Sequence, residues 1–349
     1  MRILSYAGGL GLICLIVMIM VIGRDLLVPF VIAVVIWYLI HTLSDYFQKV
    51  KVGGKGMPSW LSFSLSLLTM LLALALLYDM INSNITDVRA AAPGYQENFA
   101  KLTHRLSDLL GTDEQVNLKQ FLGQISLAPF ITNIASTMVT LAGNASLILI
   151  YLLFLILEQK FFPLKLEALL RHSSYDRTVR DILAHVQEDV EKYVAIKTFT
   201  SVLTGLACYA VLYMVGVDFA EFWAFIIFLL NFIPTVGSLL AVIFPALLSL
   251  IQFDTLTPFA IVITTLSTIQ FSIGNVLEPK LMGNSLNLSP LVVMLSLALW
   301  GSIWGITGMF LSVPFTVILM IIFAQFESTR PVAILLSQDG NIKTIRRDD

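Results

Sequence analysis

The stretch Phe228–Leu250 reads FLLNFIPTVGSLLAVIFPALLSL. It is apolar enough to cross a membrane, yet Asn231, Pro234, Gly237 and Pro245 interrupt it. A proline removes one backbone donor and clashes with the carbonyl four residues earlier, and lipid offers no water to satisfy the polar groups left exposed. Such a break has to be enclosed by protein. We therefore predict that this stretch forms part of a solute or ion pathway.

The composition of the whole chain is that of an integral membrane protein. Of its 349 residues, 57% are hydrophobic and 13% are charged, against about 25% charged in a soluble domain. The formal net charge of -2 gives no strongly basic face for nucleic acid. Cys14 and Cys208 lie in uncharged apolar runs, where cysteine behaves as a small hydrophobe. We predict an all-α membrane protein that contacts the lipid bilayer and no nucleic acid.

The distances between charged residues measure the candidate spans, because about 20 apolar helical residues cross a bilayer core. Two of the uncharged intervals, 222–253 and 281–326, would reach roughly 48 Å and 69 Å as straight helices, which is too long for one crossing. All eight candidate intervals are 3–23, 26–44, 56–78, 120–157, 198–217, 222–253, 255–277 and 281–326. The fold class is thus about eight transmembrane helices, with broken or re-entrant helices in the C-terminal half.

Lysine and arginine predict the orientation of the chain in the membrane. They gather in residues 49–55, 160–197 and 330–347, which places these segments and both termini in the cytoplasm. Each oversized interval is either a single crossing or a hairpin. Lys280 lies outside in the first case and inside in the second, and the charge pattern does not choose between them.

These spans divide the chain into six parts. Segment 79–131 carries an apolar stripe, which packs on its own chain, caps the pathway or meets another subunit. The apolar stripe in segment 158–197 favours a helix that rests on the lipid headgroups. The parts are 1–78 with three spans and a basic loop, 79–131 as an external amphipathic segment, 132–157 as a fourth span, 158–197 as a cytoplasmic amphipathic segment, 198–326 as a transport core with broken helices, and 327–349 as a cytoplasmic tail.

Polar residues of the C-terminal half are the candidates for the pathway. Interrupted helices expose carbonyls and amides that can coordinate ions or polar solutes. Glu278 is the sharpest candidate, because a carboxylate at membrane depth costs about 2.5 to 3.5 kcal/mol and usually faces a cavity or a partner. The alternative is an interfacial residue that pairs with Lys280. The candidate pathway residues are Asn231, Pro234, Gly237, Ser238, Gln270, Asn275 and Glu278.

A second group of residues predicts hinges or helix breaks. In GSIWGITGMFLSVPF, which begins at Gly301, the glycines allow a close helix approach or a bend, and Pro314 interrupts the helix that follows. Small residues at this spacing are also common in ordinary packing, and Trp300 and Trp304 are interfacial anchors or packing residues. The candidate hinge residues are Pro245, Pro279, Gly283, Pro290, Gly305, Gly308 and Pro314.

The pattern resembles the AI-2E family of bacterial membrane transporters over nearly the whole chain. The segments that carry the resemblance are NFIPTVGSLLAVIFPAL from Asn231, IGNVLEPKLMGNSLNLSPL from Ile273 and WGITGMFLSVPF from Trp304. Ser238 departs from it, since relatives commonly have proline there. The resemblance implies a bacterial inner-membrane protein that is homo-oligomeric, with a pentamer as one form, and that moves a small solute or ion.

The leading hypothesis is a secondary transporter of a small solute, with export of autoinducer-2 as one activity that the resemblance implies. Sodium/proton antiport is the alternative from the same resemblance, followed by a passive channel and a membrane scaffold that transports nothing. An enzyme is not expected, because the four histidines are scattered and no catalytic group forms in sequence. No phosphate-binding loop is present, and no metal site or cofactor is predicted.

Overall fold

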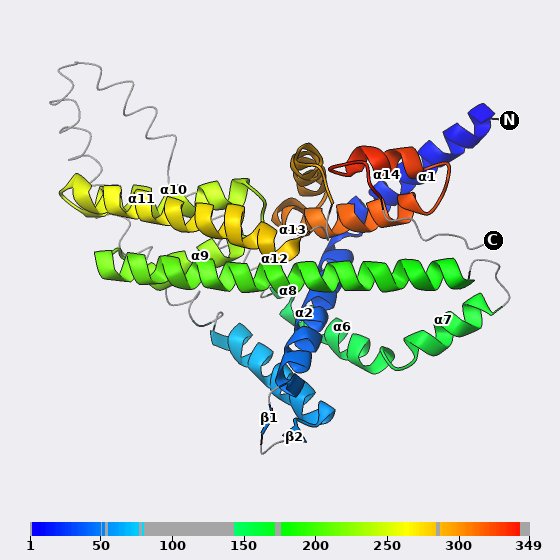
Figure 1. Cartoon of the computed structure of the whole chain (residues 1–349), viewed down its shortest axis with the longest axis horizontal. Coiled ribbons are helices and arrows are strands. Elements are labelled where there is room, and N and C mark those ends of the chain that lie inside the picture. Colours follow the sequence, from blue (N-terminus) through cyan, green and yellow to red (C-terminus); the bar gives the residue numbers. More distant parts are fainter. Residues whose placement is uncertain are drawn as a thin grey trace. The chain divides into compact units, whose positions relative to one another are not determined.

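A computed structural model describes residues 2–49, 51–52, 55–76, 79, 143–171, 176–283 and 287–342. Apart from a two-residue ladder between β1 (Lys51–Val52) and β2 (Lys55–Gly56), its regular elements are helices (Figure 1). The predicted all-α fold is confirmed. The predicted external segment, residues 79–131, falls almost wholly outside the described residues.

The chain forms two compact units. Unit 1 comprises Met1–Leu67, Asn144–Lys197 and Lys280–Asp349, and unit 2 comprises Leu68–Gly143 and Thr198–Pro279. Both units are therefore assembled from segments that are distant in sequence. The six predicted parts stay a prediction.

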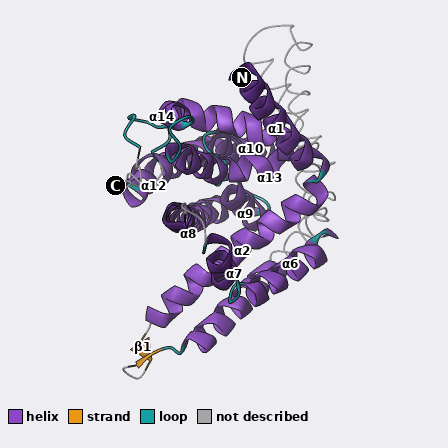
Figure 2. Cartoon of the chain, turned by 90° about the vertical axis from the view of Figure 1, so that its right-hand side faces the viewer, coloured by secondary structure: helices purple, strands orange, loops and turns teal. Residues whose placement is uncertain are grey.

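Unit 1 begins with α1 (Arg2–Ile22) and α2 (Arg24–Lys49), and α2 packs along α6 (Ala145–Glu158) (Figure 2). An edge-to-face contact joins Phe30 and Tyr151, whose ring centroids lie 5.6 Å apart. The indole nitrogen of Trp37 donates a hydrogen bond of 3.0 Å to Gln159 Oε1. A bend of 63° separates α6 from α7 (Phe162–Leu170).

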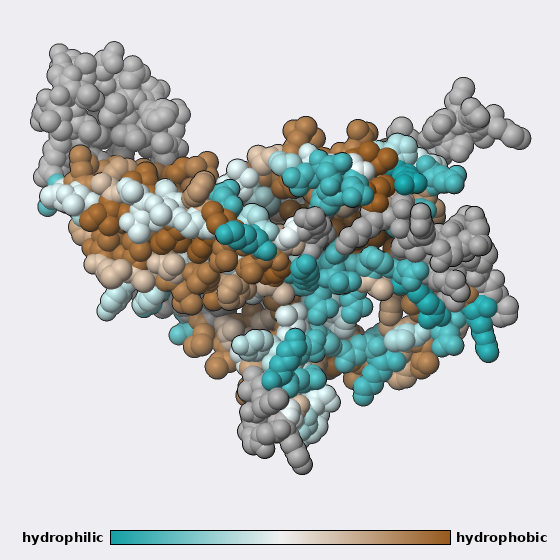
Figure 3. All heavy atoms as spheres, viewed as in Figure 1, coloured by the Kyte–Doolittle hydropathy of each residue, from teal (hydrophilic) through white to brown (hydrophobic). Residues whose placement is uncertain are grey.

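The longest of the described helices, α8 (Asp176–Val215), runs for 40 residues. Hydrophilic side chains gather on its N-terminal half and hydrophobic ones on its C-terminal half (Figure 3). The predicted amphipathic helix thus continues into the next apolar segment as one helix. At about 1.5 Å per residue it reaches roughly 60 Å, which is twice a bilayer core.

In unit 2, α9 (Ala220–Leu230) and α10 (Val236–Gln252) form a hairpin. The rings of Trp223 and Phe244 stack with centroids 6.4 Å apart, whereas 21 residues of straight helix would separate them by roughly 32 Å. The oversized interval 222–253 therefore folds back on itself. The hairpin continues into α11 (Leu256–Phe271), the π-helix η1 (Ser272–Leu277) and α12 (Glu278–Met282).

The second oversized interval also folds back, within α13 (Pro290–Ala324) of unit 1. The Trp300 indole donates a hydrogen bond of 3.2 Å to Thr316 Oγ1, although 16 residues of straight helix would separate them by about 24 Å. The reversal occurs at Trp304 and Gly305, and Gly305 has a φ of 61°, which glycine adopts without a steric cost. Of the two interpretations of each long interval, the hairpin is the one observed.

The two tryptophans of α13 are packing residues and not interfacial anchors. Trp300 and Trp304 are both 8% exposed and pack against Phe315. The Trp304 indole donates a hydrogen bond of 2.9 Å to the carbonyl of Met20 in α1. Beyond α13, α14 (Arg330–Leu336) leads to an isolated bridge between Ser337 and Leu288.

By length and composition alone, five of the described helices could cross a membrane, or six if the bent pair α6 and α7 counts as one span. The count takes α13 as one helix although it folds back at Gly305. The five are Arg24–Lys49, Ser59–Leu76, Val179–Val215, Leu256–Met282 and Pro290–Ala324. The predicted number of eight spans stays a prediction.

Candidate transport site

A buried polar face on α8 was missed by the sequence analysis. The side chains of Thr200, Ser201 and Thr204 are 0% exposed, and the same face begins at Lys197, which is 6% exposed. The spacing of these positions, one helical turn apart, was the available signal. Serine and threonine are unremarkable inside apolar helices because they can bond to their own helix, as Thr204 Oγ1 does by donating to the Thr200 carbonyl at 2.7 Å.

The break between α9 and α10 faces this polar stretch of α8. Asn231 ends α9 and is 3% exposed, and its Nδ2 donates a hydrogen bond of 3.0 Å to Ser201 Oγ. Thr235 precedes α10 with φ 58° and ψ -59°, and its side chain makes no capping hydrogen bond. The first amides of α10 therefore carry the positive end of the helix dipole without a side-chain cap.

Gly237 allows the two arms of the hairpin to pack closely. A Cβ at this position would lie 1.8 Å from the carbonyl oxygen of Leu230, so only glycine fits. The turn is closed by the amide of Val236, which donates a 2.6 Å hydrogen bond to the carbonyl of Pro234. Pro234 and Ser238 are both half-buried at the break.

The π-helix changes which residues of this segment share a face. In a regular α-helix Gln270 and Glu278 would lie about 80° apart, and the one extra residue of a π-turn reduces this to about 20°. Gln270 is buried and Glu278 half-buried, while Asn275 is exposed. Asn275 is thus a predicted pathway residue that the fold does not bring to the buried side.

Gln270 lies level with the break. The three residues 253–255 join α10 to α11, and the two helices pack together. Gln270 lies about 21 Å from this turn along the axis of α11, and the first residue of α10 lies about 24 Å from the same turn along the axis of α10. The two positions are therefore at similar heights. The side chain of Gln270 is 6% exposed, and neither its Oε1 nor its Nε2 has a hydrogen-bond partner within the described residues.

Glu278 completes the polar layer from the far end of η1. Its Oε2 accepts a hydrogen bond of 3.4 Å from Thr200 Oγ1. We define the polar layer as Thr200, Ser201, Asn231, Gln270 and Glu278. Each member lies in unit 2, where residues 198–279 contain four carboxylates and no lysine, arginine or histidine.

The predicted hinge residues fall into different environments. Pro245 is buried inside α10 and Pro314 inside α13, so both are helix-interior prolines. Gly308 would place a Cβ 1.9 Å from the carbonyl of Trp300, which explains the glycine by close approach of the α13 arms. Gly283 has a φ of 56° after α12. Pro279 is exposed in α12, and Pro290 begins α13.

The bond between Asn231 and Ser201 gives a first testable result. We expect Ser201→Ala to lower the free energy of unfolding by about 1 to 3 kcal/mol, because it leaves the buried Asn231 amide unsatisfied. Thermal unfolding in detergent measures this. Replacing Ser249, which is also 0% exposed but bonds within its own helix to the Ala246 carbonyl, is the matched control and has a smaller effect. Equal losses of stability in both variants would show that the hydrogen bond to Asn231 does not stabilise the fold beyond the loss of a buried hydroxyl group.

A helical membrane protein in which the break between two helices lies at a buried polar layer has the architecture of a small-solute transporter. The chain belongs to the AI-2E transporter family, whose model matches residues 10–328. It is a bacterial membrane protein embedded in lipid, as its relatives and its apolar helices indicate.

Three curated relatives cover most of the chain. TqsA of Escherichia coli, named an AI-2 transport protein, is 30% identical over 321 residues, which are 90% of each chain. A protein of Borreliella burgdorferi is 30% identical over 310 residues, covering 88% of this chain and 83% of its own. YhhT of Escherichia coli is 26% identical over 318 residues, covering 90% and 88%. The names of the last two assign them to transport provisionally and give no substrate.

Proposed function

We propose that this protein is a secondary transporter that moves a small polar solute through the polar layer of unit 2. The single observation that carries the proposal is the buried side-chain amide of Gln270, which has no partner among the described residues. A solute that donates and accepts hydrogen bonds satisfies both atoms of this amide. The start of α10, where the helix dipole is positive and no side chain caps the helix, lies at the same level.

The energetic cost of this arrangement favours a functional reason for it. A buried polar group without a partner costs about 1 to 3 kcal/mol, and a leucine in its place removes that cost. Glutamine at this position therefore lowers the stability of the fold relative to leucine. A bound solute offsets the cost, and water that enters the site between transport cycles offsets part of it.

Autoinducer-2 is the first solute to test, because the relative TqsA is named for its transport. Export is the direction that we propose, and it needs a gradient of the solute or of an ion as its energy source. No enzymatic role is part of the proposal.

Sodium/proton exchange is the second candidate, favoured by Glu278 and its bond to Thr200. A carboxylate and hydroxyl oxygens are ligands that suit hard cations, and a half-buried carboxylate can also carry a proton. A passive channel and a membrane scaffold without transport remain as the outcomes if neither solute nor ion is coupled.

The proposed location is the inner membrane, with both termini in the cytoplasm. With both long intervals folded back, the charge pattern puts Lys280 on the cytoplasmic side, together with the other lysine and arginine clusters. Assembly into a homo-oligomer, with a pentamer as the form to test, is part of the same proposal.

Proton coupling is tested with the carboxylate of Glu278. We expect wild-type protein in liposomes to change the signal of an internal pH dye when sodium or autoinducer-2 is added outside. Glu278→Gln abolishes this signal, because the amide can neither take up nor release a proton.

The matched control is Asp254→Asn, which changes an exposed carboxylate of the same unit and leaves the signal intact. An unchanged signal in Glu278→Gln would remove this residue from the coupling. Solute uptake without proton movement in the wild type would indicate facilitated diffusion.

A further inference from the structure

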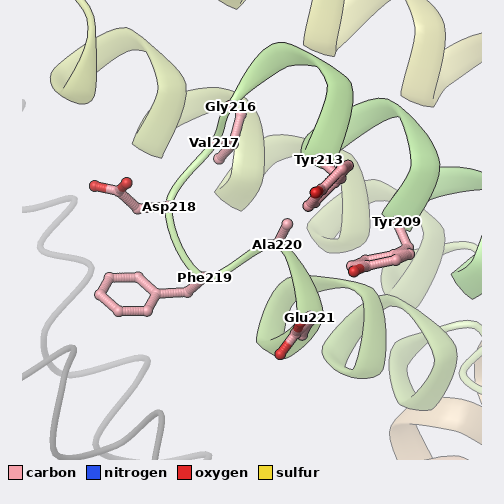
Figure 4. A pocket seen from close by; sticks show the side chains of 8 residues that line it. All are labelled: Tyr209, Tyr213, Gly216, Val217, Asp218, Phe219, Ala220 and Glu221. Carbon is pink, nitrogen blue, oxygen red and sulfur yellow. The ribbon is translucent and has the colours of Figure 1, made fainter.

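A pocket of about 380 Å³ lies where α8 ends and α9 begins. It is lined by Tyr209 and Tyr213 of α8 and by residues 216–221 (Figure 4). These residues flank the N-terminal end of α9, whereas the break of the polar layer follows its C-terminal end. The pocket is thus separate from the proposed transport site.

The wall of the pocket is fixed by a side chain from α10. Gln252 accepts a hydrogen bond of 2.8 Å from the amide of Asp218 through Oε1 and donates one of 2.8 Å to the carbonyl of Gly216 through Nε2. Gly216 and Phe219 adopt left-handed φ angles of 81° and 57° within this clamped turn. The pocket is therefore preformed, as small-molecule sites usually are.

Two aromatic rings and one carboxylate provide its chemistry. Tyr209 and Tyr213 lie one helical turn apart, with ring centroids separated by 5.8 Å and ring planes inclined by 37°. Figure 4 shows both phenol groups projecting toward the turn, with Glu221 in the first turn of α9 and Asp218 directed to the other side. Aromatic faces attract cations, most strongly where water is partly excluded.

The surrounding charges favour the same kind of ligand. No basic residue occurs between positions 198 and 279, so no side chain of this segment neutralises Glu221 with a positive charge. The C-terminal ends of α8 and α10, at Val215 and Gln252, both lie at this turn, and helix C-termini carry partial negative charge.

We propose that this pocket binds an alkylammonium group. The ammonium lies against the rings of Tyr209 and Tyr213, and Glu221 balances its charge. A free amine and the amine headgroup of a lipid present the same chemistry, and the experiment separates the two sources.

The probe is radiolabelled choline, and the measurement is its saturable binding to the purified full-length protein in detergent. We expect Tyr213→Leu and Glu221→Gln each to weaken binding by about two- to five-fold, because each removes a main source of attraction. Tyr209→Phe keeps the ring and retains binding. The matched control is Tyr46→Leu, because Tyr46 and Tyr213 are similarly exposed, at 67% and 69%.

Two results would overturn the proposal. One is the absence of saturable choline binding to a folded wild-type protein, and the other is displacement of choline by an equal concentration of sodium, which needs no aromatic ring. Binding that is strong in phosphatidylglycerol nanodiscs and lost in phosphatidylethanolamine nanodiscs supports a lipid headgroup as the occupant. Equal binding in both supports a free amine.

Discussion

Gly237→Ala is expected to disrupt the hairpin of α9 and α10 and to lower the free energy of unfolding by about 3 kcal/mol or more. The new Cβ would lie 1.8 Å from the carbonyl oxygen of Leu230 and 3.0 Å from Cβ of Ile233. Neither neighbour can rotate away, because one is backbone and the other is the first atom of a side chain. The arms of the hairpin have to separate.

Thermal unfolding followed by size-exclusion chromatography in detergent measures this loss, with an expected decrease of the apparent melting temperature by roughly 5 to 10 °C. Gly274→Ala is the matched control, because a Cβ at Gly274 of η1 meets no atom within 4 Å. A Gly237→Ala protein that is as stable as the control would contradict the close packing of α9 and α10 at this position.

The second large effect is expected from Gln270→Leu, which should make the protein more stable and less active. Leucine removes the unsatisfied amide, which raises the free energy of unfolding by about 1 to 3 kcal/mol. The same change removes a donor and an acceptor from the polar layer, so uptake of labelled autoinducer-2 into liposomes falls by at least about ten-fold. Opposite shifts of stability and activity are typical of a binding site.

Asn275→Leu is the control for this prediction, since Asn275 is an exposed amide five residues further along the same segment. It is expected to leave uptake within about two-fold of the wild type, a change of less than 0.5 kcal/mol. A Gln270→Leu protein that loses stability would indicate that the Gln270 amide bonds to another group of the protein, contrary to the proposed role.

Much of the fold could be predicted from the sequence, because unpaired backbone polar groups have a high free-energy cost in lipid. Pro234 and Gly237 marked the break between α9 and α10, and the length of the uncharged intervals marked both hairpins as irregular. Charge counting could not separate a crossing from a hairpin, because both place the C-terminus on the same side. Contacts such as Trp300 with Thr316 decide it, and they join residues 16 positions apart.

The polar layer could be predicted only in part. Asn231, Gln270 and Glu278 stood out because amides and carboxylates are rare in apolar segments. Thr200 and Ser201 did not, since hydroxyl groups are common there and bond within their own helix. The shared face of Gln270 and Glu278 depends on η1, and a regular 3.6-residue period does not reveal a π-helix.

Thiol labelling tests most directly whether the polar layer lines a solute pathway, and it does so without knowledge of the solute. In a background with Cys14 and Cys208 replaced, Gln270→Cys is compared with Leu266→Cys, one helical turn earlier on the same buried face and 0% exposed. Small thiol reagents need water at the site, because the thiolate is the reactive form. We expect rapid labelling at position 270 and none at position 266. Equally inert thiols at both positions would contradict it.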